Sequence, residues 1–175
     1  SLLVGCANGI YTYKNNLFKK IKIDNEDELY PIYSMAYLDH KHLWVGNSNG
    51  LFLISDGSAK KYSLGPSSGH NFINFLLLEN DTILWAGTNH GLNEINIASF
   101  TNDDGIIFRN YTPDDGARSY ETNLNAAFKS NSGTLWFGTI NGALMFDRRN
   151  VQTKNKAYVP LLSISQIQLS LNNTN

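Results

Sequence analysis

The stretch "LWVGNSNGLFLI" (43–54) decides the fold because the chain repeats it. It returns as "LWAGTNHGLNEI" (84–95) and "LWFGTINGALMF" (135–146), and more faintly as "LLVGCANGIYTY" (2–13). Aromatic and β-branched residues dominate these copies, which is typical of strands. The chain has no run of a dozen residues with the apolar spacing of a helix, so the repeat is built from strands.

The period of the repeat identifies the architecture. The second glycine of each copy is Gly9, Gly50, Gly91 and Gly142, so the spacings are 41, 41 and 51 residues. A period near 40 residues in a strand-rich chain predicts the blades of a β-propeller. The longer last interval lies in 98–123, which holds two "DDG" turns and predicts one elongated loop.

We therefore expect an all-β fold: a partial β-propeller of about four four-stranded antiparallel blades in residues 1–159. The predicted repeats occupy residues 1–23, 32–64, 71–112 and 124–159. The first repeat holds three predicted strands and lacks its inner strand. The fourth strand of the last repeat is predicted at 156–160.

The motif residues have structural roles in this prediction. A tryptophan in each of three copies is expected to fill the gap between neighbouring blades: Trp44, Trp85 and Trp136. Burying such a ring contributes roughly 2–3 kcal/mol or more. Glycines two residues later share that face and allow a close approach: Gly46, Gly87 and Gly138. The second glycines, Gly50, Gly91 and Gly142, suit the left-handed conformation of tight hairpins.

Composition excludes several functions. The net charge is −1 with 14 basic and 15 acidic residues, so nucleic-acid binding is not expected. The basic pair Arg148-Arg149 is interpreted as a solvated turn beside Asp147. Cys6 is the only cysteine, so neither an intramolecular disulfide nor a cysteine metal cage can form. No apolar run of 18 residues occurs, so direct membrane insertion is not expected.

Three copies, "LWVGNSNGL", "LWAGTNHGL" and "LWFGTINGAL", resemble two-component regulator propeller repeats. The resemblance extends over residues 2 to about 159. The first copy departs from the pattern, with Leu3 in place of tryptophan and Cys6-Ala7 in place of the usual Thr or Asn. The tail "YVPLLSISQIQLSLNNTN" (158–175) resembles the entry into the Ig-like domain that follows such propellers. Residues 160–175 are thus expected to be a linker and first Ig-like strand, or a strand that completes a blade.

The resemblance implies a periplasmic sensor region of a Bacteroidetes hybrid two-component system, a sensor histidine kinase fused to a response regulator. It implies an oligosaccharide ligand and signal relay by binding rather than catalysis. The kinase lies outside this chain, so the chain itself is expected to have no catalytic residues, cofactor or metal. The partners it implies are the remaining propeller blades and the Ig-like domain of the longer protein.

Enzymatic and metal-binding alternatives find little support in the residues. "SNSGTLW" (130–136) approaches a sialidase-type hairpin, yet it lacks the aspartate and has different spacing. His40 and His42 are interpreted as solvated turn histidines. The "DDG" turns do not match the calcium-loop pattern.

Candidate ligand-binding residues lie in the turns and connections that the strand order places on one face of the propeller. They are Tyr30, Asn49, His70, Asn89, His90, Arg118, Tyr120 and Asn141. The simpler alternative is that these polar residues are solvated or cap hairpins. Two other functions remain open: a scaffold that forms a dimer or inter-domain surface, and a propeller glycosidase. An arc of blades exposes two apolar end faces, so self-association of the chain is also expected.

Overall fold

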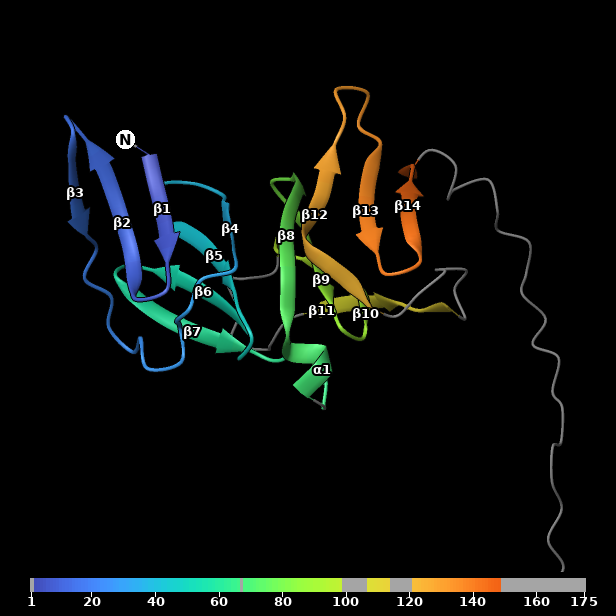
Figure 1. Ribbon diagram of the computed structural model, residues 1–175, viewed down its shortest axis with the longest axis horizontal. Coiled ribbons are helices and arrows are strands. Elements are labelled where there is room, and N and C mark those ends of the chain that lie inside the picture. Colours follow the sequence, from blue (N-terminus) through green and yellow to red (C-terminus); the bar gives the residue numbers. More distant parts are fainter. Residues whose placement is uncertain (1, 67, 99–106, 114–120, 149–175) are drawn as a thin grey trace, which may run out of the picture.

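A computed structural model describes residues 2–66, 68–98, 107–113 and 121–148, and these fold almost entirely as β-strands. The strands form four antiparallel sheets that follow one another in chain order, as Figure 1 shows. The all-β partial propeller predicted from the repeat is therefore confirmed. A four-residue helix, α1 (Ser68–Asn71), lies between the second and third sheets.

The bounds of the strands follow the repeat. The first sheet contains β1 (Leu2–Cys6), β2 (Gly9–Lys14) and β3 (Leu17–Lys20). The second contains β4 (Ser34–Tyr37), β5 (His42–Gly46), β6 (Leu51–Ser55) and β7 (Ser58–Tyr62). The third contains β8 (Ile73–Asn80), β9 (Ile83–Thr88), β10 (Gly91–Asn96) and β11 (Ile107–Tyr111). The fourth contains β12 (Thr122–Lys129), β13 (Leu135–Thr139) and β14 (Gly142–Phe146).

The second and third sheets have the predicted four strands, and each strand pairs with its neighbour in the chain. The first sheet has three strands, β1 to β3, and none of the described segments adds an inner strand to it, as predicted. The fourth sheet has three described strands, because the strand predicted at 156–160 lies outside the described residues. The expected linker or strand at 160–175 also lies outside them, as do both "DDG" turns.

Two strand boundaries differ from the prediction. The first predicted repeat extends to residue 23, whereas its last strand, β3, ends at Lys20, and the chain then crosses to the next sheet. There the Asp24 N–H donates to the Gly57 carbonyl at 2.8 Å, and the Ala59 N–H donates to the Asp24 carbonyl at 2.9 Å. The third predicted repeat begins at residue 71, whereas its first strand, β8, begins at Ile73, because the side chain of Asn71 accepts the Leu64 N–H at 2.9 Å and holds a turn there.

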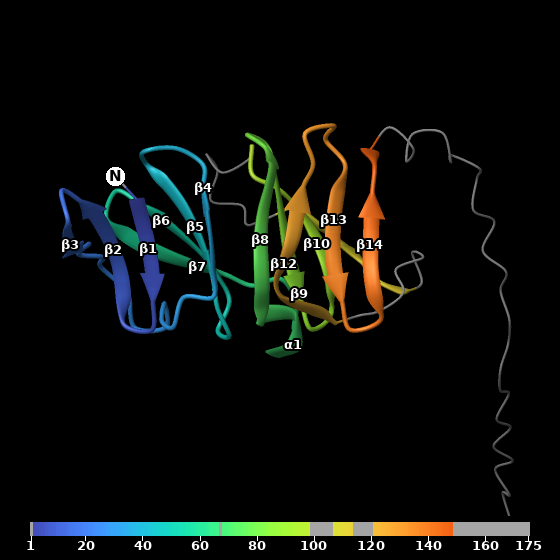
Figure 2. The same ribbon diagram turned by 45° about the horizontal axis from the view of Figure 1, so that its top comes forward.

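The sheets pack as blades around a common centre. The inner strand β8 contacts β4 of the second sheet and β12 of the fourth. Figure 2 shows β4, β8 and β12 following one another along the molecule, with the turns between the second and third strands of the repeats along its lower edge. The core is divided accordingly into hydrophobic clusters between successive sheets.

The repeated tryptophans show how the interfaces between successive sheets, here called joints, are filled. Trp44 lies in the cluster between the second and third sheets, and Trp85 lies between the third and fourth; both are fully buried. Trp136 differs from the prediction, since it is 42% exposed. Its neighbours Leu135 and Phe137 point to the third sheet and are buried, so Trp136 points the other way, beyond the last described sheet.

Two glycines of the motif are required for different physical reasons. At Gly46 a Cβ would lie 2.3 Å from Cγ2 of Ile73 in the next sheet, so glycine permits the close approach of the sheets. At Gly91 the φ angle is +111°, and a Cβ would lie 2.6 Å from the main-chain oxygen of Tyr111. The first glycine thus serves the joint and the second serves the hairpin.

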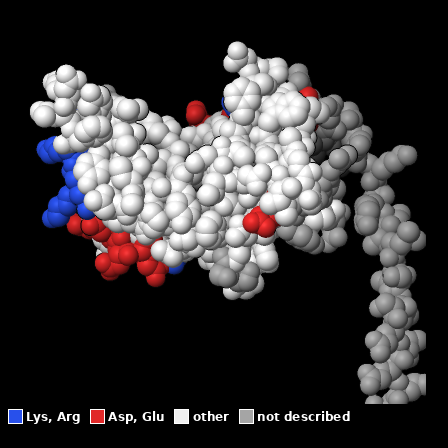
Figure 3. Space-filling view, in the orientation of Figure 1, with Lys and Arg blue, Asp and Glu red and all other residues white. Residues whose placement is uncertain are grey.

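Charged residues gather at one end of the molecule. Figure 3 shows Lys and Arg at the end that carries β3, acidic residues close to them, and few charges over the rest of this face. Lys19 and Lys20 lie in β3, and Lys20 Nζ lies 3.8 Å from Glu26 Oε1 in the connection that follows. Lys61 and Glu28 form a second ion pair at this end. Basic and acidic groups therefore neutralise one another, and the structure shows no extended positive surface among the described residues of this face.

Candidate functional site

Most of the predicted ligand-binding residues lie on one rim of the molecule. The turns at 47–50, 89–90 and 140–141 meet the connections that enter the sheets, and we call this edge the turn rim (Figure 2). The Nδ2 of Asn49 donates to the Glu28 carbonyl at 3.0 Å, and the Ile140 N–H donates to the Glu121 carbonyl at 3.3 Å. The turns and connections therefore share one face, as the strand order predicts.

A buried asparagine fixes the turn rim at the second sheet. Asn47 is fully buried, and its Nδ2 donates to the carbonyls of Glu28 at 2.9 Å and Leu29 at 2.7 Å. Its Oδ1 accepts the N–H groups of Asn49 at 2.7 Å and Gly50 at 3.1 Å. A buried amide with all its groups satisfied stabilises the contact between turn and connection. Asn47 is therefore structural, although its turn was predicted to be a ligand-facing one.

A second buried asparagine joins the third and fourth sheets. The Nδ2 of Asn74 donates to Asn89 Oδ1 at 2.9 Å, to the Thr122 carbonyl at 2.9 Å and to Thr122 Oγ1 at 3.2 Å. The Thr122 hydroxyl donates in turn to the Thr88 carbonyl at 3.1 Å. Sequence reasoning missed both asparagines, because a buried asparagine in a turn or strand start resembles a solvated one in sequence.

Several predicted residues are occupied by intramolecular contacts. The Tyr30 hydroxyl donates to Glu26 Oε2 at 2.7 Å, and its half-buried ring packs against the cluster between the first two sheets. Burial raises the pKa of Tyr30, and the hydrogen bond to Glu26 adds to this. Asn141 is exposed at the fourth sheet, where its N–H donates to Thr139 Oγ1 at 3.3 Å. Arg118 and Tyr120 lie outside the described residues.

The structure brings His70 and His90 together. Their ring centroids are 4.5 Å apart and the rings meet edge to face, at 67°. Two residues beyond His70, the ring of Phe72 lies 5.6 Å from that of Tyr33. We call these two neighbouring ring pairs, His70 with His90 and Tyr33 with Phe72, the ring cluster. It is half-buried except at exposed His90, and Asn89 lies beside it in the turn.

The ring cluster favours an uncharged imidazole at His70. Burial lowers the pKa of His70, and the nearby His90 lowers it further because two positive charges would repel each other. A neutral imidazole can both donate and accept a hydrogen bond. Together with the aromatic faces and the Asn89 amide, the cluster offers stacking surface and hydrogen-bonding groups of both kinds.

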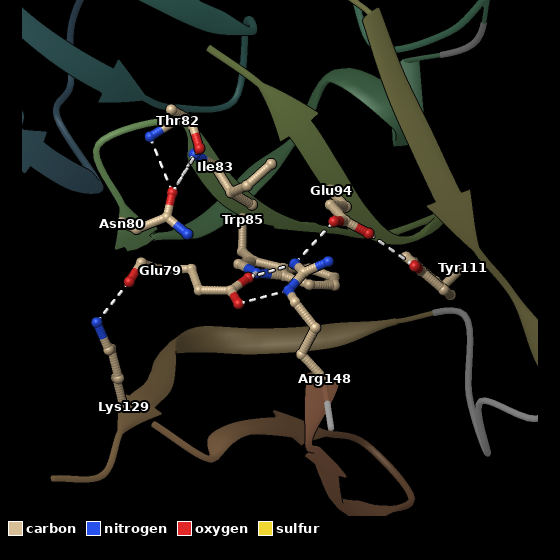
Figure 4. A network of polar contacts seen from close by, with 9 residues as sticks. All are labelled: Glu79, Asn80, Thr82, Ile83, Trp85, Glu94, Tyr111, Lys129 and Arg148. Carbon is tan, nitrogen blue, oxygen red and sulfur yellow. Dashed lines mark hydrogen bonds and ion pairs between the residues drawn. The ribbon is translucent and has the colours of Figure 1, made fainter. Parts of the chain in front are cut away.

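A second set of polar residues lies between the third and fourth sheets. Figure 4 shows the side chain of Arg148, just after the end of β14, directed toward Glu79 and Glu94 of the third sheet. Its Nε donates to Glu79 Oε1 at 2.7 Å, and its Nη2 donates to Glu79 Oε2 at 2.5 Å and Glu94 Oε1 at 2.8 Å. Trp85 Nε1 donates to Glu79 Oε2 at 2.8 Å, and Tyr111 donates to Glu94 Oε2 at 2.7 Å. We call these five residues the Arg148 clamp.

The Arg148 clamp places one guanidinium between two nearly buried carboxylates. The side chains of Glu79 and Glu94 are only 11% and 15% exposed. The hydrogen bonds from Arg148 lower the pKa of Glu79 despite its burial, and burial together with Glu94 raises the pKa of Tyr111 to about 12. The Glu79 carboxylate therefore stays ionised at neutral pH, and a single guanidinium joins it to Glu94.

The interpretation of Arg148 as part of a solvated turn is therefore wrong. Arg148 lies 69 residues from Glu79, and local sequence gives no sign of that contact. One signal was present: Glu94 lies two residues after the buried Leu92 in β10 and so shares its face, which places a carboxylate between the sheets. A buried carboxylate needs a cationic or hydrogen-bonding partner.

Within residues 2–66, 68–98, 107–113 and 121–148, no group of three His, Cys, Asp or Glu side chains is placed to hold a metal ion. His42 instead lies with Nδ1 3.0 Å from both carboxylate oxygens of Asp39. In the same part of the chain, no helix has the length and apolar character needed to cross a membrane.

Comparison with known proteins shows which solved structures have a similar fold. No family model matches the chain, and no curated protein matches it. Among solved structures, the extracellular domain of BT3049 from B. thetaiotaomicron, described as a hybrid two-component system, superposes with a TM-score of 0.59. The sequences are 17% identical, and the match covers 83% of this chain and 20% of that one.

A second solved structure gives a similar result. The extracellular domain of BT4673 from B. thetaiotaomicron, described as a one-component system, superposes with a TM-score of 0.58 at 23% identity. The match covers 82% of this chain and 19% of that one. The chain thus spans about one fifth of the length of these structures, and at such identities the likeness concerns the fold. The described residues share the fold of part of the extracellular domains of Bacteroides hybrid two-component and one-component systems.

Proposed function

We propose that this chain is part of the extracellular, periplasmic sensor region of a hybrid two-component signalling protein. Its role is to bind a ligand and relay the signal, without catalysis. The observation that carries the proposal is the fold likeness, which covers more than four fifths of the chain in two extracellular domains of bacterial signalling systems. The repeat motif supports it independently, because the motif resembles that of two-component regulator propellers.

The proposed ligand is an oligosaccharide bound at the ring cluster. Sugars present apolar C–H faces that stack on aromatic rings and hydroxyl groups that need donors and acceptors. The ring cluster supplies both, since Tyr33 and Phe72 are paired rings, His70 and His90 are paired imidazoles, and His90 directly follows Asn89 in the turn. Its position on the turn rim, at the joint of the second and third sheets, leaves His90 exposed to an incoming ligand.

Relay requires that the ligand favour one arrangement of the sheets over another, since only a difference in affinity shifts an equilibrium. Asn89 is suited to this, because its Oδ1 accepts the hydrogen bond of Asn74, and Asn74 also holds Thr122 of the fourth sheet. A ligand that engages Asn89 therefore acts on a group that joins two sheets. The Arg148 clamp fixes the same two sheets on the opposite side.

The binding proposal is tested by titrating the chain with an oligosaccharide array and then by calorimetry with any sugar that binds. We expect His90→Ala to weaken binding at least about tenfold, the effect of losing one or two ligand contacts. Tyr120→Ala tests a second residue that the sequence predicts to bind the ligand, and it should weaken binding in the same way. His40→Ala is the matched control, because His40 is an exposed histidine outside the ring cluster. Equal affinities of His90→Ala and His40→Ala would exclude the ring cluster as the site.

A scaffold role is the second candidate, and one surface favours it. Phe128, Trp136 and Met145 are cross-strand neighbours on the outer face of the fourth sheet, and all three are exposed. We call them the end rung. The equivalent tryptophans Trp44 and Trp85 are each covered by a further sheet, so the end rung has the shape of half a joint.

We propose that a second copy of the chain covers the end rung, which gives self-association. Light scattering at increasing protein concentration should show a dimer or larger species, and Trp136→Glu should shift it to monomer. Lys14→Glu changes an exposed residue at the other end of the chain and should leave the dimer intact. A monomer at all concentrations would contradict the scaffold role and leave the ligand proposal untouched.

A further inference from the structure

The turn that carries His90 is fixed by hydrogen bonds on both of its sides. The His90 N–H donates to Thr88 Oγ1 at 3.0 Å, and the Thr88 hydroxyl donates to the Gly91 carbonyl at 2.9 Å. From the outer strand β11, Asn110 Nδ2 donates to the His90 carbonyl at 3.1 Å and to Asn93 Oδ1 at 2.8 Å. The main chain at His90 is therefore held in one place, and this determines where the imidazole lies.

Two glycines leave room for the imidazoles of the ring cluster. They come from the connection that precedes β8 and includes α1. At Gly69 a Cβ would lie 2.9 Å from Nδ1 of His90, and at Gly65 a Cβ would lie 2.5 Å from Cγ of His70. The backbone thus packs closely on both rings. Because the His90 ring contacts His70 on another side, its rotation is restricted.

One hydrogen bond decides which ring nitrogen of His90 carries the proton. Nδ1 of His90 lies 3.0 Å from the main-chain carbonyl oxygen of Asn89. A carbonyl oxygen accepts and never donates, so Nδ1 must carry the hydrogen. In a neutral imidazole the other nitrogen, Nε2, then has a lone pair and accepts hydrogen bonds. The Asn89 carbonyl therefore sets the chemistry that the exposed His90 presents.

We propose that the sugar residue that contacts His90 is uncharged and donates a hydroxyl hydrogen to Nε2. This inference rests on the proposed oligosaccharide site and specifies the class of ligand that the site accepts. A hydroxyl donates to a lone pair, whereas a carboxylate or a sulfate has only acceptor atoms and would be repelled by it. The contacts that hold the turn within the described residues come from amides, hydroxyls and the main chain, so they add no positive charge to offset that repulsion.

The opposite tautomer of His90 would reverse the preference. With the hydrogen on Nε2, the ring would donate to an anionic group of the ligand. The lone pair of Nδ1 would then face the Asn89 carbonyl oxygen at 3.0 Å, and two acceptors at that distance would lose their hydrogen bond. The short separation therefore favours the form of His90 that accepts at Nε2.

The first test examines the tautomer and needs no ligand. The 175-residue chain, labelled with ¹⁵N-histidine, is studied by NMR in mildly alkaline buffer, where the protonated and unprotonated ring nitrogens differ in chemical shift. We expect His90 to carry its proton on Nδ1, and the exposed control His40 to carry it mainly on Nε2, as a solvated imidazole does. A His90→Gln chain identifies the His90 signal by its loss. A proton mainly on Nε2 of His90 would overturn the inference.

The second test examines the ligand class. On an oligosaccharide array, each neutral sugar is printed beside uronate counterparts that carry a carboxylate on one residue at a time. For any neutral sugar that binds, we expect at least one counterpart to bind about tenfold more weakly. In His90→Gln the side-chain amide can present either its oxygen or its nitrogen, so this difference should fall below about threefold. His40→Gln is the matched control and should leave the difference unchanged.

The outcomes separate this inference from the proposed function. If no sugar on the array binds, the proposed oligosaccharide site is wrong, and the ligand class falls with it. If sugars bind and all their uronate counterparts bind equally well or better, only the inference about His90 is overturned. Equal effects of His90→Gln and His40→Gln on the difference would also overturn that inference alone.

Discussion

Trp85 and Trp136 occupy the same place in consecutive copies of one motif, and their surroundings differ completely. Trp85 is fully buried, with Phe146 at 4.8 Å and Phe137 at 5.3 Å between ring centroids, and its indole donates to Glu79. Trp136 has Phe128 and Met145 beside it on its own sheet and remains 42% exposed. The motif therefore builds one half of a joint, and the next sheet provides the other half.

The largest difference is expected from truncating the two tryptophans. Trp85→Ala should lower the free energy of unfolding by about 3–5 kcal/mol, because it removes a fully buried ring and leaves a cavity. Trp136→Ala should lower it by about 1 kcal/mol or less, since much of that ring already contacts water. Urea unfolding followed by circular dichroism measures both values. Equal losses would show that Trp136 is covered in solution, which is the result expected of a self-associated chain.

The hairpin glycines allow a second comparison of the same two sheets. Gly91 and Gly142 have φ angles of +111° and +117°, so alanine at either site takes a strained backbone. At Gly91 the added Cβ would also approach the Tyr111 carbonyl, whereas at Gly142 nothing lies within 4 Å. We expect losses of about 3 kcal/mol for Gly91→Ala and about 1 kcal/mol for Gly142→Ala in urea unfolding. A larger loss at Gly142 would contradict the described geometry.

The Arg148 clamp should contribute somewhat less to the free energy of unfolding than Trp85 or Gly91. Arg148→Met removes the cation between two nearly buried carboxylates, and we expect a loss of about 2 kcal/mol, reduced from that of a fully buried pair because Arg148 is 41% exposed. Arg148→Lys keeps the charge and loses the two-pronged hydrogen bonding, so it should fall between wild type and Arg148→Met. Urea unfolding of the three proteins gives this order. A lysine variant as unstable as the methionine variant would show that geometry, rather than charge, stabilises the joint.

The smallest expected effect is a dependence on pH. Arg148, with help from Trp85, holds the pKa of Glu79 below its ordinary value of 4.5, while burial acts in the opposite direction. A carboxylate with a lowered pKa in the folded state stabilises the protein above its ordinary pKa, and this contribution is lost as pH falls through the lowered value. The urea midpoint should therefore decrease between about pH 5 and pH 3. Glu79→Gln should decrease less over this range, and an identical decrease in both proteins would exclude Glu79 as the cause.

Sequence reasoning succeeded where the information is local. A period of strands, a tryptophan and a glycine two residues later are enough to place β5, β9 and β13, because alternation and hairpin geometry are set within a few residues. It failed where partners come from distant segments. The bond from Asn74 to Thr122 spans 48 residues, and the pairing of Arg148 with Glu79 spans 69.

The candidate site shows the same division. The strand order correctly placed the turns and the connections on one rim, and the contact of His70 with His90 follows from that placement. Which of the polar residues are already engaged could not be predicted, because an asparagine that satisfies buried carbonyls and one that faces water have the same local sequence. Asn47 and Asn49 lie two residues apart in one turn, yet one is buried and the other exposed.

The hydrogen bonds of Asn47 have a consequence for how this rim can change during evolution. All four of its partners are main-chain atoms, the carbonyls of Glu28 and Leu29 and the N–H groups of Asn49 and Gly50. Every amino acid except proline supplies both groups, so the side chain at position 28 can be replaced without loosening the turn. A single buried amide thus leaves the side chain at position 28 open to mutation, and the surface of the turn rim can change while the blade stays intact.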